Sequence, residues 1–141
     1  MIKVSAEKII TFNINEALRF EGYTATYILY TGARINSLLE KAGEWTMPAN
    51  LDYSEQAEKS LVIALAKFSE TVEQSAKEYE PSILTQYLFD LAQLFNDFYH
   101  NCPILTVDET VKNSRLVLAE HANKVLNKGL EIIGIEIVKE M

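Results

Sequence analysis

The chain has 141 residues, 48% of them hydrophobic, and its 20 acidic and 13 basic side chains give a net charge of −7. This length can bury a core without a metal or a disulfide, and the lone Cys102 excludes an intramolecular disulfide. No apolar run approaches the ~20 residues of a membrane span. We therefore expect one cytoplasmic domain, with no membrane or DNA partner. The acidic balance also argues against independent nucleic-acid binding, because phosphate groups attract basic surfaces.

The first part of the chain predicts one connector, one short helix and one long helix. Residues 1–12 are interpreted as a connector, and residues 13–20 as a short helix that Gly22 ends. Thr24 is well placed to cap a long helix that stops at Gly43. Residues 43–53 then form the main loop, in which Trp45 and Met47 are expected to cover the core.

The middle of the chain predicts two helical regions divided by a proline. Apolar residues recur at helical spacing from Ser54 to Ser69, and a second segment continues to Pro81. Pro81 suits the first turn of a helix, and the residues after it share one broad apolar face. This central core helix should end before Pro103, because the residue before a proline disfavours the helical conformation.

The last part of the chain predicts one more long helix. Asp108 caps it, Gly129 lies near its end, and residues 130–141 are expected to be a C-terminal tail. Arg115 falls inside its apolar arc, where an unpaired guanidinium would be costly. We expect Arg115 to pair with Asp90 or Asp97, or else to line a groove where RNA supplies the anion. Residues 1–141 are thus predicted to be one all-α domain, a compact bundle of about five helices.

The long helix near the N-terminus carries two different faces. At about 100° per residue, Tyr27, Tyr30 and Arg34 fall on one arc, which can stack on and hydrogen-bond planar polar ligands such as nucleobases. A separate aliphatic arc can pack into a core, where Gly32 is expected to let another backbone come close. That second arc consists of Ile28, Ile35 and Leu39.

The same segment carries a family resemblance. The spacing Gly-x-Thr-x-x-Tyr-x-x-Tyr-x-x-x-Arg resembles the entry to the C-terminal anticodon-binding domain of arginyl-tRNA synthetases, an all-helical domain named after an Asp-Ala-Leu-Arg motif. Three more strings match in the family's order, YLFDLAQLFNDFYHNCPIL, SRLVLAEHANKVLNKGL and GIEIVKEM. The resemblance covers nearly the whole chain and implies a DALR-type anticodon-binding domain.

The resemblance also implies a set of tRNA-binding residues. Tyr27, Tyr30 and Arg34 would hold unstacked bases, Tyr99 would lie beside the anticodon loop, and the terminal Met141 would pack against an anticodon base. Stacking on an aromatic ring is worth ~1–3 kcal/mol per base. Structural alternatives stay open at this point: one tyrosine of the arc in the core, Arg34 paired with a carboxylate, Tyr99 in the core, and Met141 as a frayed end.

The sequence predicts no catalytic centre on this chain. Class I aminoacyl-tRNA synthetases use a pair of histidines two residues apart and a Lys-Met-Ser-Lys loop, and neither occurs here. No phosphate-binding loop or Cys/His metal spacing is present. A nucleophilic Cys102 paired with His100 or His121 is a minor alternative to a packed thiol. No cofactor or metal is expected on the chain itself, and ATP is implied only for the catalytic domain of the parent enzyme.

Two hypotheses about function follow. In the first, the chain is the anticodon-loop module of an arginine-tRNA ligase, reading the cytosine at the middle anticodon position, with arginine tRNA and a catalytic domain as partners and a monomeric state. In the second, a freestanding domain of the same fold docks on a protein and has lost tRNA recognition. Leu29, in place of the family's usual glutamine, Ala25 and Thr26, in place of its usual Gly-Pro, and the negative charge favour the second.

Overall fold

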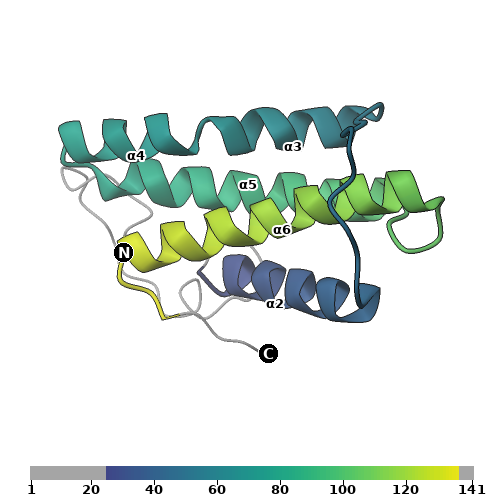
Figure 1. Ribbon diagram of the computed structural model, residues 1–141. Helices are drawn as coiled ribbons and strands as arrows, with labels where there is room; N and C mark the ends of the chain where they lie inside the picture. Colours follow the sequence, from purple (N-terminus) through teal and green to yellow (C-terminus); the bar gives the residue numbers. More distant parts are fainter. Residues whose placement is uncertain (1–24, 137–141) are drawn as a thin grey trace.

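A computed structural model describes residues 25–136, and over this range the chain is an all-α bundle without strands (Figure 1). The predicted fold class is confirmed. None of the described helices is long and apolar enough to cross a membrane. The predicted connector at residues 1–12, the short helix at 13–20 and Met141 lie outside the described residues. The helices are α2 (Ala25–Ala42), α3 (Gln56–Ala66), α4 (Phe68–Lys77), α5 (Pro81–Asn101) and α6 (Glu109–Ile132).

The helices form three layers. The long helices α5 and α6 pack against each other in the middle, α2 covers one side of this pair, and α3 and α4 cover the other (Figure 1). Helix α2 therefore lies across the bundle from α3 and α4. Because residues 52–80 hold seven acidic and three basic side chains, most of the acidic excess sits on the layer farthest from α2.

Local chemistry explains most helix ends. Pro81 occupies the first turn of α5, and Cys102, which precedes Pro103, is extended with φ −116° and ψ 103°, as the sequence predicted. The side chain of Asp108 accepts a hydrogen bond from the Val111 N–H at 3.2 Å and caps α6. Helix α6 continues past Gly129 to Ile132, so the first residues of the predicted tail are helical.

Aromatic and aliphatic side chains of α5 form the centre of the core. Phe95 and Phe98 are fully buried, with ring centroids 5.8 Å apart. Every residue from 113 to 119 of α6 is buried, because this part of the helix is surrounded by neighbours. The loop after α2 contributes to that enclosure, since the Tyr53 hydroxyl donates to the Ser114 carbonyl at 3.3 Å.

Arg115 pairs with a carboxylate that the sequence did not indicate. Its Nε donates to Glu58 Oε1 at 2.6 Å, and its Nη1 donates to the Pro103 carbonyl at 2.6 Å. The prediction that Arg115 pairs with Asp90 or Asp97 is therefore wrong. Both of these carboxylates lie exposed on α5. Glu58 lies in the acidic segment 52–80, yet it is 1% exposed. A desolvated pair of this kind is costly to break by removing one partner.

The two glycines inside helices have different surroundings. A Cβ on Gly32 would lie 3.9 Å from the Oδ1 atoms of Asn123 and Asn127, an ordinary contact. The expected close backbone approach at Gly32 is therefore wrong. A Cβ on Gly129 would lie 2.3 Å from Leu88 Cδ2, and Leu88 is fully buried. The tight position in the bundle is Gly129, where α6 crosses α5.

We expect alanine substitutions at these glycines to change stability in opposite directions. Gly32→Ala should raise the free energy of unfolding by about 0.5–1 kcal/mol, because alanine loses less backbone entropy in a helix. Gly129→Ala should lower it by about 1–3 kcal/mol, because the methyl group overpacks Leu88. Urea unfolding followed by circular dichroism would measure both, and a stabilised Gly129→Ala variant would contradict the packing described here.

Tyr87 makes stability sensitive to high pH. Its hydroxyl donates to the Ala64 carbonyl at 2.9 Å, and burial raises the pKa of Tyr87 from 10.0 to about 12. Below pH 10 the phenol is protonated in the folded and unfolded states, so its contribution is complete. Between pH 10 and 12 the unfolded chain releases the proton first, which favours unfolding.

We therefore expect the wild-type chain to lose more stability than Tyr87→Phe between pH 10 and 12. The difference should stay below about 1 kcal/mol, because a half-buried group is partly screened by solvent. Urea unfolding at a series of pH values would measure it. Equal losses in the two proteins would show that Tyr87 does not contribute.

Candidate nucleic-acid interface

Three of the predicted site residues lie together where α2 packs on α5. Tyr30 is 49% exposed and Tyr99 is 38% exposed. The Arg34 guanidinium carbon lies 4.8 Å from the Tyr30 ring centroid and 5.5 Å from the Tyr99 ring centroid. We call this surface the Tyr30–Arg34–Tyr99 face. Two rings around one cation are suited to planar, electron-rich ligands. Met141, the fifth predicted residue, lies outside the described range.

Arg34 is held by neutral groups. Its Nη1 donates to Asn96 Oδ1 and its Nη2 donates to the Tyr30 hydroxyl at 3.1 Å. Among residues 25–136 no carboxylate pairs with it, which argues against the structural alternative of a simple ion pair. A guanidinium has five N–H donors, so three of those on Arg34 have no partner among the described residues. The side chain thus keeps its charge and most of its donors for a ligand.

Tyr27 takes a supporting place at the edge of the site. It is half-buried and packs against the core, with its ring centroid 5.2 Å from that of Phe89. Its hydroxyl accepts a hydrogen bond from Asn96 Nδ2 at 2.9 Å. The open alternative that one tyrosine of the arc belongs partly to the core therefore applies to Tyr27. Direct contact between Tyr27 and a base stays a prediction.

Asn96 connects these side chains and was missing from the predicted site. It is buried on α5, donates to the Thr31 hydroxyl at 3.1 Å as well as to Tyr27, and accepts from Arg34. The sequence carried a usable signal, because Asn96 is an amide within the apolar face of the central helix. Buried amides are almost always hydrogen-bonded. A single amide on an apolar helix face therefore predicts hydrogen bonds from that position to a neighbouring helix.

Charge is distributed unevenly around this face. Helix α2 contains two basic residues and one acidic residue, Arg34, Lys41 and Glu40. The acidic layer of α3 and α4 lies on the opposite side of α5 and α6. The net charge of −7 is therefore not concentrated around Arg34, and exposed charges farther apart than about 10 Å are largely screened at moderate salt.

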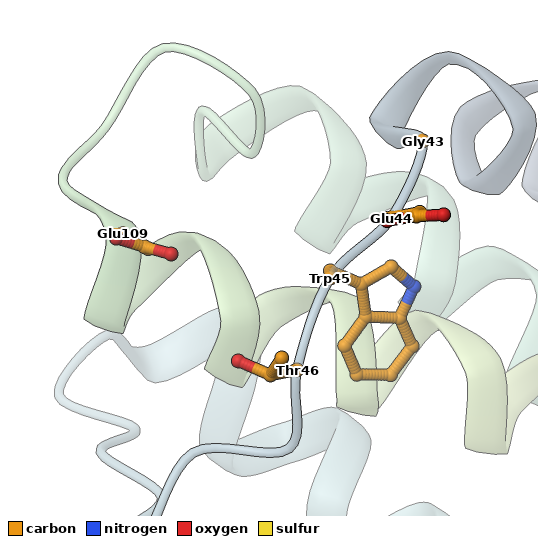
Figure 2. Close-up of a pocket in the computed structure, with 5 residues that line it drawn as sticks. All are labelled: Gly43, Glu44, Trp45, Thr46 and Glu109. Atoms are coloured by element: carbon orange, nitrogen blue, oxygen red, sulfur yellow. The ribbon is translucent and has the colours of Figure 1, made fainter.

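A hollow beside the loop after α2 is a poor site for RNA. It is lined by Glu44, Trp45 and Thr46 of that loop and by Glu109 in the first turn of α6 (Figure 2). Trp45 packs against the core as predicted, whereas Met47 is 66% exposed, so its predicted covering role is wrong. Two glutamates and no basic side chain line the hollow, which disfavours a phosphate there.

The described residues offer no support for a catalytic cysteine or a metal. Burial raises the pKa of the Cys102 thiol, which Arg115 only partly opposes, so the nucleophilic thiolate is disfavoured. His100 is exposed and its ring contacts Tyr99. His121 instead bonds the Val117 carbonyl at 2.8 Å. Within residues 25–136 no three His, Cys, Asp or Glu side chains are grouped to hold a metal ion.

Taken together, the layered helices and the Tyr30–Arg34–Tyr99 face define an all-α domain with one exposed aromatic and cationic surface. Residues 28–141 match the DALR anticodon binding domain family, and the chain belongs to this family. The resemblance found in the sequence is thereby confirmed.

Similar proteins are several times longer than this chain. It is 40% identical over 132 residues to an arginine–tRNA ligase of Haemophilus ducreyi, covering 92% of the chain and 24% of that protein. It is 38% identical to an arginine–tRNA ligase of Pyrococcus abyssi, and the match covers 96% of the chain and 23% of that protein. The structure superimposes on Thermus thermophilus arginyl-tRNA synthetase with a TM-score of 0.91 at 38% identity. The superposition covers 99% of the chain and 25% of that synthetase. The chain thus spans about a quarter of the length of these relatives.

Two neighbouring aromatic residues of α5 should respond differently to truncation. Phe98→Ala should cost about 3–5 kcal/mol of stability, because Phe98 is fully buried. Tyr99→Ala should cost much less, under about 1.5 kcal/mol, because Tyr99 is 38% exposed at the surface of the bundle. Urea unfolding of both variants would measure the difference. A loss at Tyr99 as large as that at Phe98 would place Tyr99 in the core and remove it from the site.

Proposed function

We propose that the chain is the anticodon-loop binding module of an arginine–tRNA ligase. It holds arginine tRNA by the anticodon loop and reads the cytosine at the middle position. The observation that carries the proposal is the position of Arg34 between two exposed tyrosine rings, with three N–H donors unused by the described residues. Membership of the anticodon-binding family supports binding of the anticodon loop. The match to about a quarter of a longer arginine–tRNA ligase supports a role as one module of such an enzyme.

Such a module binds the anticodon loop by stacking and by charge-assisted hydrogen bonds. Bases of an anticodon loop are read singly when they are unstacked, and the Tyr30 and Tyr99 rings supply stacking surfaces. Arg34 donates to a base edge or a phosphate, and Met141 packs against a base. Binding at this end positions the acceptor end of the tRNA at a catalytic domain, where the ATP-dependent ligation takes place. The module acts in the cytoplasm, as a monomer.

Two departures from the family's usual sequence, Leu29 and Gly32, lie away from the Tyr30–Arg34–Tyr99 face. Leu29 packs against the hydrophobic core, and Gly32 is buried facing amide side chains of α6. Neither residue removes a group from the proposed contact surface. Most of the net acidic excess lies on the opposite layer. These placements support tRNA binding over protein docking.

A titration with two RNAs tests this function. The chain should bind arginine tRNA more tightly than the same tRNA with an altered middle anticodon base, by about tenfold or more, as expected for loss of ~1–3 kcal/mol of base-specific contacts. Both affinities should fall with salt, because phosphate contacts release counterions, while their ratio persists. Fluorescence anisotropy at two salt concentrations would measure this. Equal affinity for both RNAs would contradict the proposal.

Two substitutions that each remove one positive charge distinguish a specific contact at the proposed site from general electrostatic attraction. Arg34→Gln should weaken binding of arginine tRNA about tenfold or more, because a charge-assisted contact is lost. Lys77→Gln, on the far layer, should leave affinity within about twofold, because an exposed distant charge is screened. Lys77 is exposed on α4 and pairs only with the neighbouring Glu73. Equal losses in the two variants would indicate non-specific attraction.

A further inference from the structure

The Asn96 amide makes three hydrogen bonds, and all of them cross from α5 to α2. Its Nδ2 donates to the Tyr27 hydroxyl at 2.9 Å and to the Thr31 hydroxyl at 3.1 Å, and its Oδ1 accepts from Arg34 Nη1. Asn96 is 9% exposed and Thr31 is fully buried. The polar cluster is thus sealed on the core side, while Tyr30 is exposed and Tyr27 and Arg34 are partly exposed.

The partners of this amide fix its orientation. A guanidinium can only donate, so the atom of Asn96 that faces Arg34 must be the carbonyl oxygen. The Thr31 hydroxyl donates to the Tyr27 carbonyl oxygen at 2.9 Å and therefore accepts from the amide nitrogen. Turning the amide over would place donors against the Arg34 donors and an acceptor against the Thr31 acceptor. One arrangement satisfies the buried groups, and it fixes where Arg34 is held.

We propose that Asn96 is a positioning residue, which holds the Arg34 guanidinium between the Tyr30 and Tyr99 rings before RNA arrives. The inference rests on the proposed function for its role in binding, while the positioning itself is a property of the free protein. A free arginine side chain loses rotamer entropy when a ligand immobilises it. Asn96 removes part of that loss in advance, and its neutral oxygen leaves the charge of Arg34 uncompensated.

A double-mutant cycle tests whether Asn96 acts through Arg34. Asn96→Ala should weaken binding of arginine tRNA about tenfold although Arg34 is still present. Adding Asn96→Ala to Arg34→Gln should weaken binding no more than about twofold further, because the residue it positions is already gone. If the two losses multiply instead, Asn96 does not act through Arg34 and the proposal fails.

A matched control separates positioning from general loosening of α2. Asn123 Nδ2 donates to Asn36 Oδ1 at 2.7 Å and joins α6 to α2 through another amide. Asn123→Ala should lower thermal stability but leave RNA affinity within about twofold. An equal loss of affinity in Asn123→Ala and Asn96→Ala would mean that any weakened contact of α2 suffices, and would overturn the proposal.

A second variant keeps the volume of the side chain. Asn96→Asp retains an acceptor for Arg34, pairs it with a negative charge and loses the donors to Tyr27 and Thr31. Binding should fall about tenfold, and the dependence on salt should become shallower, because one cation no longer counts toward the phosphates. Unchanged affinity with an unchanged salt dependence would contradict the proposal.

A measurement without RNA distinguishes failure of this inference from failure of the proposed function. In nitrogen-15 spectra, the Arg34 side-chain signals should show hindered rotation in the wild-type chain and free rotation in Asn96→Ala, with Arg34→Lys identifying the signals. Hindered rotation that is lost in Asn96→Ala supports positioning even if no RNA binds. The same mobile signals in both proteins would refute it, whatever the chain binds.

Discussion

A single buried amide fixes how α2 meets α5 on the side that carries the proposed site. The three hydrogen bonds of Asn96 set the relative positions of a tyrosine, a threonine and an arginine on α2. Bonds among buried polar groups are costly to leave unmade, so the interface has one favourable arrangement. The surface groups Tyr30, Arg34 and Tyr99 lie directly beside this interface.

The main stabilising contacts of the bundle lie in its centre and on the side away from the proposed site. Phe95, Phe98 and Leu88 pack the centre, and the buried pair of Glu58 with Arg115 joins α3 to α6 on the other side of the bundle. The acidic helices therefore contribute to the core through Leu61 and Glu58 without surrounding Arg34. This arrangement explains how a chain with a net charge of −7 can present a cationic, aromatic surface.

Features that repeat along the sequence were predictable. Helical spacing, Pro81 and Asp108 gave the all-α class, the start of α5 and the cap of α6. Features that depend on contact between distant segments were not. Spacing alone does not show that Glu58, inside an acidic run, turns inward to Arg115. It also does not show that Gly129 rather than Gly32 meets a neighbouring helix closely.

The site was predictable in part for the same reason. Tyr27, Tyr30 and Arg34 share one helix, so their common arc follows from 3.6 residues per turn. Tyr99 came from the family resemblance, and its approach to Arg34 depends on how α5 crosses α2. Asn96 was missed because the role of a buried amide depends on its hydrogen-bond partners. All three of its partners lie on α2, which is distant from α5 in the sequence.

The most direct test of the account is where the anticodon loop touches the chain. Nuclear magnetic resonance spectra of the chain with isotope-labelled tyrosine and arginine side chains would be recorded with an anticodon stem-loop of arginine tRNA. The account predicts contacts between base protons and the rings of Tyr30 and Tyr99, together with shifted Arg34 signals. Contacts confined to α3 and α4, with the Tyr30 and Tyr99 rings unchanged, would contradict it.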